Sequence, residues 1–236
     1  LGHCKAQKEK VRAMFPADRI IFDHSQAFFT HQAGSLANLY SPRKFFGVAD
    51  GGLLDTQVFI PDPATQDHDS FSNSTHLLLQ HEFDTRSGYS HFQQAEAALV
   101  EINATGMSCL TDRLLRSADY EHVKTIRERN YQMLREQLDE LNGFPFTDDT
   151  VSGPFCYPFY FTARPLQQAL IARGVFVATY WREVLERVDA DSVEANFVNY
   201  MVPLPCDQRY SEEDIEQLSG IVRAVVADNP GRSHDS

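Results

Sequence analysis

Residues 19–52 read RIIFDHSQAFFTHQAGSLANLYSPRKFFGVADGG, and this stretch decides the fold that we predict. The run 19–23 is short, β-branched and aromatic, which predicts a buried strand that ends on Asp23. A second strand is expected at 37–41, and Lys44 follows it in a turn that contains a proline. Ligands of α/β sheets gather outside the carboxyl ends of the strands. The stretch therefore predicts an α/β fold with a ligand site near Asp23 and Lys44.

The remaining sequence predicts a chain in two parts. Residues 1–118 are expected to form a partial large α/β domain, and residues 119–230 a small α+β domain that begins with a long joining helix. A disordered tail is expected at 231–236. Helices are predicted at 4–14, 91–102, 119–141, 165–174 and after Ser211, and further strands at 51–60, 155–161, 175–181 and 196–205.

Composition narrows the class of protein. The 236 residues carry a formal charge of −12, which argues against nucleic-acid binding because that function needs a basic surface. No run is long and apolar enough to cross a membrane, and no signal peptide opens the chain. The four cysteines are far apart and lack metal-ligand spacing, so we expect no metal site. These features favour a reduced, cytoplasmic protein.

Lys44 lies between Arg43 and Phe45-Phe46, which is unusual company for a lysine. A lysine becomes a nucleophile toward carbonyl groups when an apolar pocket or a nearby cation lowers the pKa of its amine. The alternative is an ordinary surface lysine beside a turn. The charged segment 127–129 is interpreted as surface charge on the long helix.

Three further residues could form a site with Lys44. An acid at a strand end, such as Asp23, can accept the protonated ring nitrogen of pyridoxal phosphate (PLP), although a helix N-cap is the alternative. Gln26 follows Asp23 by three residues, and Ser41 precedes Lys44 by three and could contact a phosphate. The glycines of the segment 47–52 permit positive φ or a close backbone approach.

Together these segments resemble the DegT/StrS-type sugar aminotransferases, PLP-dependent enzymes of fold type I. The resemblance rests on FDHSQAFF at 22–29 and SPRKFFGVADGG at 41–52, and it extends over almost the whole chain through segments 120–134 and 200–218. It implies that Lys44 forms the internal aldimine with PLP, and that Asp23 pairs with the pyridine nitrogen. It further implies that Gln26 contacts the ring or its phenolic oxygen, and that Ser41 contacts the phosphate.

The resemblance also implies the reaction, transfer of an amino group from an amino acid to a keto-sugar or similar carbonyl acceptor, in a homodimer. Residue 1 lines up after the N-terminal half of the family's large domain, so the chain is expected to lack that half. A second hypothesis is therefore a truncated or non-catalytic remnant that acts only with a partner chain. A third is an α/β domain for another phosphate ligand, although no common phosphate-loop motif is present.

Overall fold

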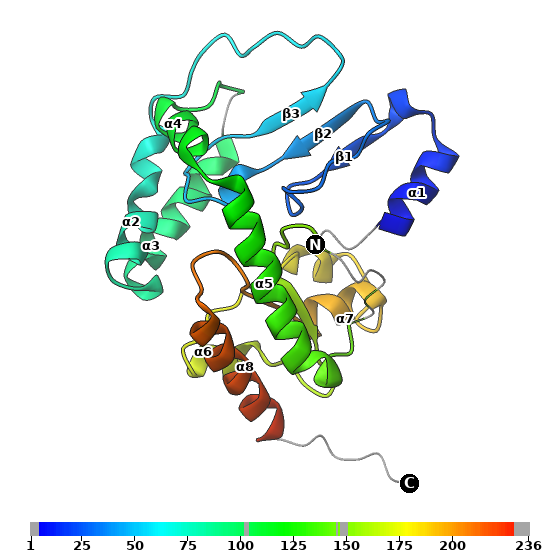
Figure 1. Cartoon of the computed structure of the whole chain (residues 1–236), viewed down its shortest axis with the longest axis vertical. Coiled ribbons are helices and arrows are strands. Elements are labelled where there is room, and N and C mark those ends of the chain that lie inside the picture. Colours follow the sequence, from blue (N-terminus) through cyan, green and yellow to red (C-terminus); the bar gives the residue numbers. More distant parts are fainter. Residues whose placement is uncertain (1–4, 102–103, 145, 147–150, 229–236) are drawn as a thin grey trace. The chain divides into compact units, whose positions relative to one another are not determined.

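The structure is a computed structural model that describes residues 5–101, 104–144, 146 and 151–228 (Figure 1). The tail predicted at 231–236 and Cys4 lie outside the described residues. The chain divides into two compact units between Tyr120 and Glu121. In the described part, no helix has both the length and the apolar character needed to span a membrane.

The first unit contains a sheet of three strands in the order β1-β2-β3. The strands are β1 (Ile21–Asp23), β2 (Ala37–Tyr40) and β3 (Leu53–Thr56), and they follow helix α1 (Lys5–Met14). The pair β1 and β2 is parallel, with Asp23 level with Leu39, and β3 runs antiparallel to β2 (Figure 1). The parallel pair confirms the α/β character that the sequence predicts.

The prediction that the run 19–23 is a buried strand is wrong for one face of the sheet. Ile21 is 56% exposed, and Leu39 and Leu54 lie on the same face at 42% and 45% exposure. Side chains alternate between the two faces of a strand, so these three residues share one face, and we call them the apolar row. Leu39 and Leu54 are level with Asp23, whereas Ile21 is level with Ala37. Among the residues that the structure describes, none buries the apolar row.

The opposite face of the sheet covers an aromatic cluster. Phe28 is at its centre and contacts Tyr40, Phe45 and Phe46, with ring centroids 5.9, 5.6 and 5.1 Å away. Phe45 is only 2% exposed. Aromatic rings that meet at these separations stabilise a core beyond the area that they bury.

Strand β3 is shorter than the predicted strand 51–60. The hydroxyl of Thr56 donates to the carbonyl of Leu36 and accepts from the amide of Val58, so side-chain bonds replace the ladder at this point. Helices α2 (Thr75–Glu82), α3 (Thr85–Ala97) and α4 (Cys109–Ser117) follow. Single 3₁₀ turns lie at Ala17–Arg19, Pro42–Lys44, Ser70–Ser74 and Ala98–Glu101.

The second unit packs helices against a two-stranded antiparallel sheet of β4 (Tyr157–Tyr160) and β5 (Met201–Leu204). Its helices are α5 (Tyr120–Leu138), α6 (Gln167–Ala172), α7 (Val193–Tyr200) and α8 (Glu212–Ala227), with 3₁₀ turns at Asp139–Leu141 and Arg182–Glu186. The core takes side chains from α5, β4, α6, β5 and α8. Leu134 and Leu138 of the predicted apolar stripe on α5 are fully buried in it.

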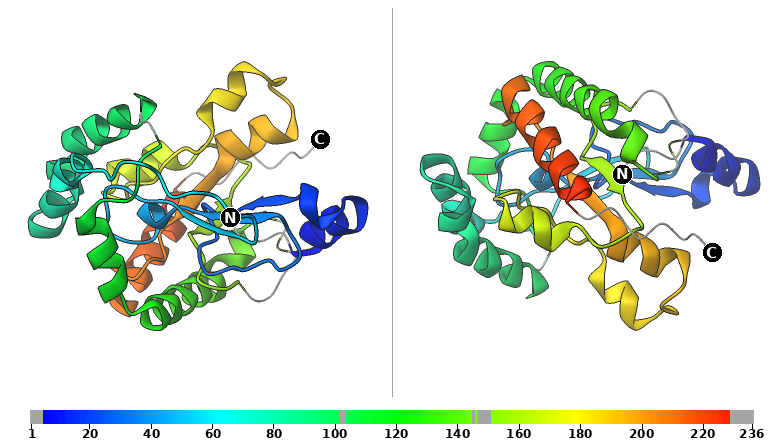
Figure 2. Two further views of the ribbon diagram at one scale, coloured as in Figure 1. Left: turned by 90° about the horizontal axis from the view of Figure 1, so that it is seen from above. Right: turned by 90° about the horizontal axis from the view of Figure 1, so that it is seen from below.

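Helices α5 and α8 lie side by side in Figure 2, where α5 is green and α8 orange to red. The carbonyl and side chain of Gln137 accept hydrogen bonds from Arg223 and Ser219 of α8. The predicted capping box is present, because Ser211 and Asp214 exchange side-chain and backbone bonds at the start of α8.

Two strand predictions in this unit are wrong. Residues 175–181 form no strand. Gln167 donates to the Val177 carbonyl and accepts from the Thr179 hydroxyl in this segment. The predicted strand 196–205 begins as helix α7, since Ser192 caps that helix by accepting from the amide of Ala195. Only residues 201–204 of that range are a strand.

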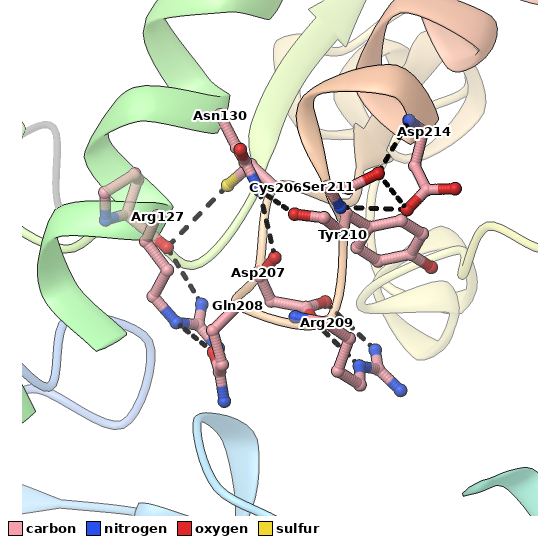
Figure 3. A network of polar contacts seen from close by, with 10 residues as sticks. Arg127, Asn130, Cys206, Asp207, Gln208, Arg209, Tyr210, Ser211 and Asp214 are labelled. Atoms are coloured by element: carbon pink, nitrogen blue, oxygen red, sulfur yellow. Dashed lines mark hydrogen bonds and ion pairs between the residues drawn. The ribbon is translucent and has the colours of Figure 1, made fainter. Parts of the chain in front are cut away.

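The interpretation of segment 127–129 as surface charge is also wrong for Arg127, which is 2% exposed. Its guanidinium donates to the Gln208 side chain at 2.9 Å and to the Pro154 carbonyl at 3.0 Å (Figure 3). Beside it, the fully buried Asn130 donates to the carbonyls of Asp207 and Tyr210. These polar side chains of α5 hold the chain segment that leads from β5 into α8.

Candidate functional site

Lys44 ends the short 3₁₀ turn Pro42–Lys44 that follows β2. The next residue, Phe45, enters the aromatic cluster, and its amide donates to the carbonyl of Pro42 at 2.9 Å. Arg43 donates to Glu96 of α3 at 2.6 Å, which fixes the turn from the other side. Lys44 itself is exposed, and it forms no ion pair with any residue that the structure describes. Among the residues that the structure describes, none encloses the Lys44 amine in an apolar pocket.

Asp23 ends β1 and lies at the same sheet edge as the Lys44 turn. Strands β1 and β2 are parallel, so their carboxyl ends meet at this edge. The Asp23 carboxylate accepts the amide of Ser25 at 2.8 Å. Hydrogen bonds from Ser25, with a smaller contribution from the Lys44 charge, lower the pKa of Asp23 below its ordinary value. The site thus has an ionised carboxylate and an exposed amine at the same edge of the sheet.

The roles predicted for Gln26 as a ring contact and for Ser41 as a phosphate contact remain predictions. Gln26 is half-buried in the turn after β1, and Ser41 is half-buried just after β2. Ser41 and Arg43 line a cavity of about 650 Å³ in the first unit. Asp23, Gln26 and Lys44 are not among the described residues that line it.

The Asp-Gly-Gly segment packs against α4. The carboxylate of Asp50 accepts the amide and hydroxyl of Ser108 at 2.6 and 2.7 Å, and it also accepts the hydroxyl of Thr111. It thereby supplies a negative charge at the helix N-terminus, where the helix dipole favours one. Gly51 has φ +99°, and a Cβ there would lie 3.0 Å from Met107. The close approach that the glycines permit is therefore to α4 and the residue before it.

His24 follows Asp23 directly and is not among the predicted site residues. Its ring is 1% exposed, and Nε2 lies 2.9 Å from Oδ1 of Asn38. It stacks on Tyr40 with ring centroids 5.2 Å apart. The alternation of side chains after Asp23 is the only signal in the sequence that places His24 on the inner face.

These residues fit one part of PLP well. The ionised Asp23 suits a protonated ring nitrogen, and the unpaired Lys44 suits the aldehyde carbon. For the phosphate, the Ser41 hydroxyl is the one contact that the sequence predicts.

Comparison with solved structures reveals close folds. The chain matches a "DegT DnrJ EryC1 StrS aminotransferase" from Brucella abortus at 16% identity and TM-score 0.54, over 95% of this chain and 61% of that chain. It matches a chain from Streptococcus pneumoniae, solved in its PMP form, at 12% identity and TM-score 0.56, over 93% of this chain and 64% of that chain. It matches DesI, solved in the presence of its TDP-sugar product, at 18% identity and TM-score 0.56, over 94% of this chain and 59% of that chain.

These matches show the fold. The chain has the α/β fold of PLP-dependent aminotransferases, and within that class the fold of the DegT/DnrJ/EryC1/StrS type. It spans about three fifths of the length of these solved chains. No protein-family model matches the sequence, and the search of curated proteins gives no significant match.

Proposed function

We propose that this chain is the lysine-bearing part of a PLP-dependent aminotransferase that moves an amino group from an amino acid to a keto-sugar or similar carbonyl acceptor. The observation that carries the proposal is that an ionised Asp23 and the exposed Lys44 lie at one sheet edge, in a fold that aminotransferases share. A complete enzyme of this kind is expected to be a homodimer.

The chain's residues supply separate parts of the chemistry. PLP, when bound, supplies an electron sink for the carbon next to the reacting nitrogen. Asp23 would hold a proton on the ring nitrogen, because its own pKa is lowered and its carboxylate stays ionised. Lys44 would hold the cofactor and, once released, carry a proton between the two carbons that exchange it. Gln26 would orient the ring, and the Ser41 hydroxyl would bind the phosphate.

A second candidate is a chain that acts only with a partner, or that has lost catalysis. The exposed apolar row of Ile21, Leu39 and Leu54 favours it, because parallel sheets are normally covered on both faces. The exposure of Lys44 favours it too.

Titration with PLP tests the proposal. Lys44 is the only lysine between Lys10 and Lys124, so modification at this position is easy to map. We expect the visible absorbance band of lysine-bound PLP with the wild-type chain and its loss in Lys44→Ala. Borohydride reduction and peptide mapping should place the label on Lys44.

The matched control is Lys10→Ala, because Lys10 is an exposed lysine on α1. This variant should keep the band. If wild type shows no band at millimolar PLP, the second candidate replaces the first. A label spread equally over Lys10, Lys44 and Lys124 would reject the assignment of Lys44.

A further inference from the structure

We propose that His24 is a positioning residue for Asp23, held in one neutral tautomer by Asn38, and that it thereby fixes the carboxylate beside Lys44. The inference rests on the proposed function for the role of Asp23. The position of His24 itself rests on the geometry of the first unit alone.

His24 is held at three points. Its ring is 1% exposed and stacks on Tyr40, with 19° between the ring planes. Its backbone amide donates to the carbonyl of Leu39 at 2.7 Å, which extends the parallel ladder by one bond beyond Asp23. Its Nε2 lies 2.9 Å from Oδ1 of Asn38. The residue after Asp23 is therefore fixed by its backbone, its ring face and its ring edge.

The surroundings of Asn38 decide where the proton lies on His24. Asn38 is 4% exposed, and its Nδ2 points to two acceptors, the carbonyl of Gln32 at 3.2 Å and the carboxylate of Asp55 at 3.3 Å. Neither group can donate, so the amide nitrogen must face them and Oδ1 must face His24. Since Oδ1 only accepts, Nε2 of His24 must carry the proton.

The other ring nitrogen, Nδ1 of His24, is buried and has no hydrogen-bond partner among the residues that the structure describes. A proton on Nδ1 would leave a buried donor unsatisfied and a buried charge uncompensated, so the neutral form with the proton on Nε2 is favoured.

Adjacent residues in extended backbone point to opposite faces of the sheet. A fixed His24 ring therefore determines where the Asp23 carboxylate lies on the other face. The hydrogen bond from Ser25 to Asp23 then holds the carboxylate in place. Small displacements in a reacting geometry are costly, and a shift of about 1 Å can lower a rate 100-fold. We therefore expect His24 to matter for a ligand that Asp23 binds, although its ring faces away from it.

The tautomer can be read directly by ¹⁵N NMR of the histidine side chains at pH 7.5, with the wild-type chain and no cofactor. We expect His24 to show a protonated Nε2 and an unprotonated Nδ1. The opposite tautomer, or a rapid mixture of the two, would overturn the proposal.

Two substitutions separate positioning from packing. His24→Gln keeps an N–H that can reach Asn38, whereas His24→Phe keeps the stacked ring but leaves Asn38 Oδ1 unpaired. We expect the Ser25 amide resonance to stay near its wild-type position in His24→Gln and to move in His24→Phe. We expect PLP to bind about tenfold more weakly to His24→Phe than to His24→Gln. His31→Gln is the matched control, because His31 contacts Asp55 at the exposed end of the same network.

A purely structural role would lower the melting temperature of His24→Phe and leave the native Ser25 resonance unchanged, which would contradict positioning. If His24→Phe fails to fold, the tautomer of His24 in the wild-type chain and the Ser25 amide resonance in His24→Gln still test the proposal. If PLP binds to no variant, the proposed function fails, whereas the tautomer and Ser25 measurements still test the role of His24.

Discussion

The pKa of His24 lies below its ordinary value, because burial penalises the charged imidazolium. The nearby charge of Lys8 also lowers the pKa of His24, and His31 does so weakly, whereas the Asn38 bond and the Asp23 charge raise it. In the unfolded chain the same histidine has a pKa of about 6.5. Between its lowered pKa in the folded state and about pH 6.5, His24 therefore binds more proton in the unfolded state than in the folded state.

This difference sets the sign of a pH effect on stability. Stability rises with pH wherever the unfolded state binds more protons, so the His24 contribution is present above about pH 6.5 and is lost as the pH falls below it. Each unit of pKa depression corresponds to about 1.4 kcal/mol. Urea unfolding at pH 7.5 and pH 5.5 should show a smaller loss of stability in His24→Gln than in wild type. An equal loss of unfolding free energy in wild type and His24→Gln would contradict this pH effect of His24. His31→Gln serves as the control.

Single residues could be predicted from the sequence when their role was local. Asp23 and Lys44 follow predicted strands, and the structure places both at one sheet edge. Arg127 and His24 were missed because their burial depends on distant partners. Arg127 bonds to Gln208, which lies 81 residues away, and helix periodicity cannot reveal such a contact.

At the scale of elements, the Asp-Gly-Gly turn gives a clear prediction. Gly51→Ala should destabilise the chain by about 1–3 kcal/mol, because φ +99° strains an L residue and the added Cβ would lie 3.0 Å from Met107. Gly47→Ala is the matched control, since a Cβ there meets no atom within 4 Å and the backbone is not in the left-handed region. Denaturant midpoints of the two variants should differ clearly. A Gly51→Ala variant as stable as Gly47→Ala would show that the turn does not constrain α4.

The sequence predicted elements well where hydrophobic periodicity and caps agreed. Helix α8 matches its prediction because the Ser211 cap and the apolar face point to the same segment. Residues 175–181 look like a strand by composition, yet no neighbouring strand pairs with them. Strand propensity therefore identified an apolar segment but not its backbone conformation, because propensity says nothing about which strand is present to pair with it.

At the scale of the whole molecule, the two units differ in how completely they bury their sheets. In the second unit, β4 and β5 are buried beneath helices, and Tyr157, Phe159 and Leu204 have no exposed surface. In the first unit, one face of the sheet keeps the apolar row of Ile21, Leu39 and Leu54 exposed. Composition did not predict this contrast, because both units have ordinary apolar content and exposure depends on which elements are at hand to cover a face.

The contrast predicts that residues 121–228 fold on their own. Every residue of the second unit's core lies at or beyond Tyr131, and the bonds of Arg127 to Pro154 and Gln208 also remain inside this segment. A domain of this size with one continuous core should unfold in a single cooperative transition, with a free energy of unfolding of about 5–15 kcal/mol. Far-UV and near-UV circular dichroism during urea unfolding should give coincident curves. Residues 5–120 expressed alone should instead bind a hydrophobic dye, because their sheet face is uncovered. Loss of the near-UV signal in 121–228 would show that this unit depends on the first unit for folding, and the absence of dye binding by 5–120 would contradict the exposure of the apolar row.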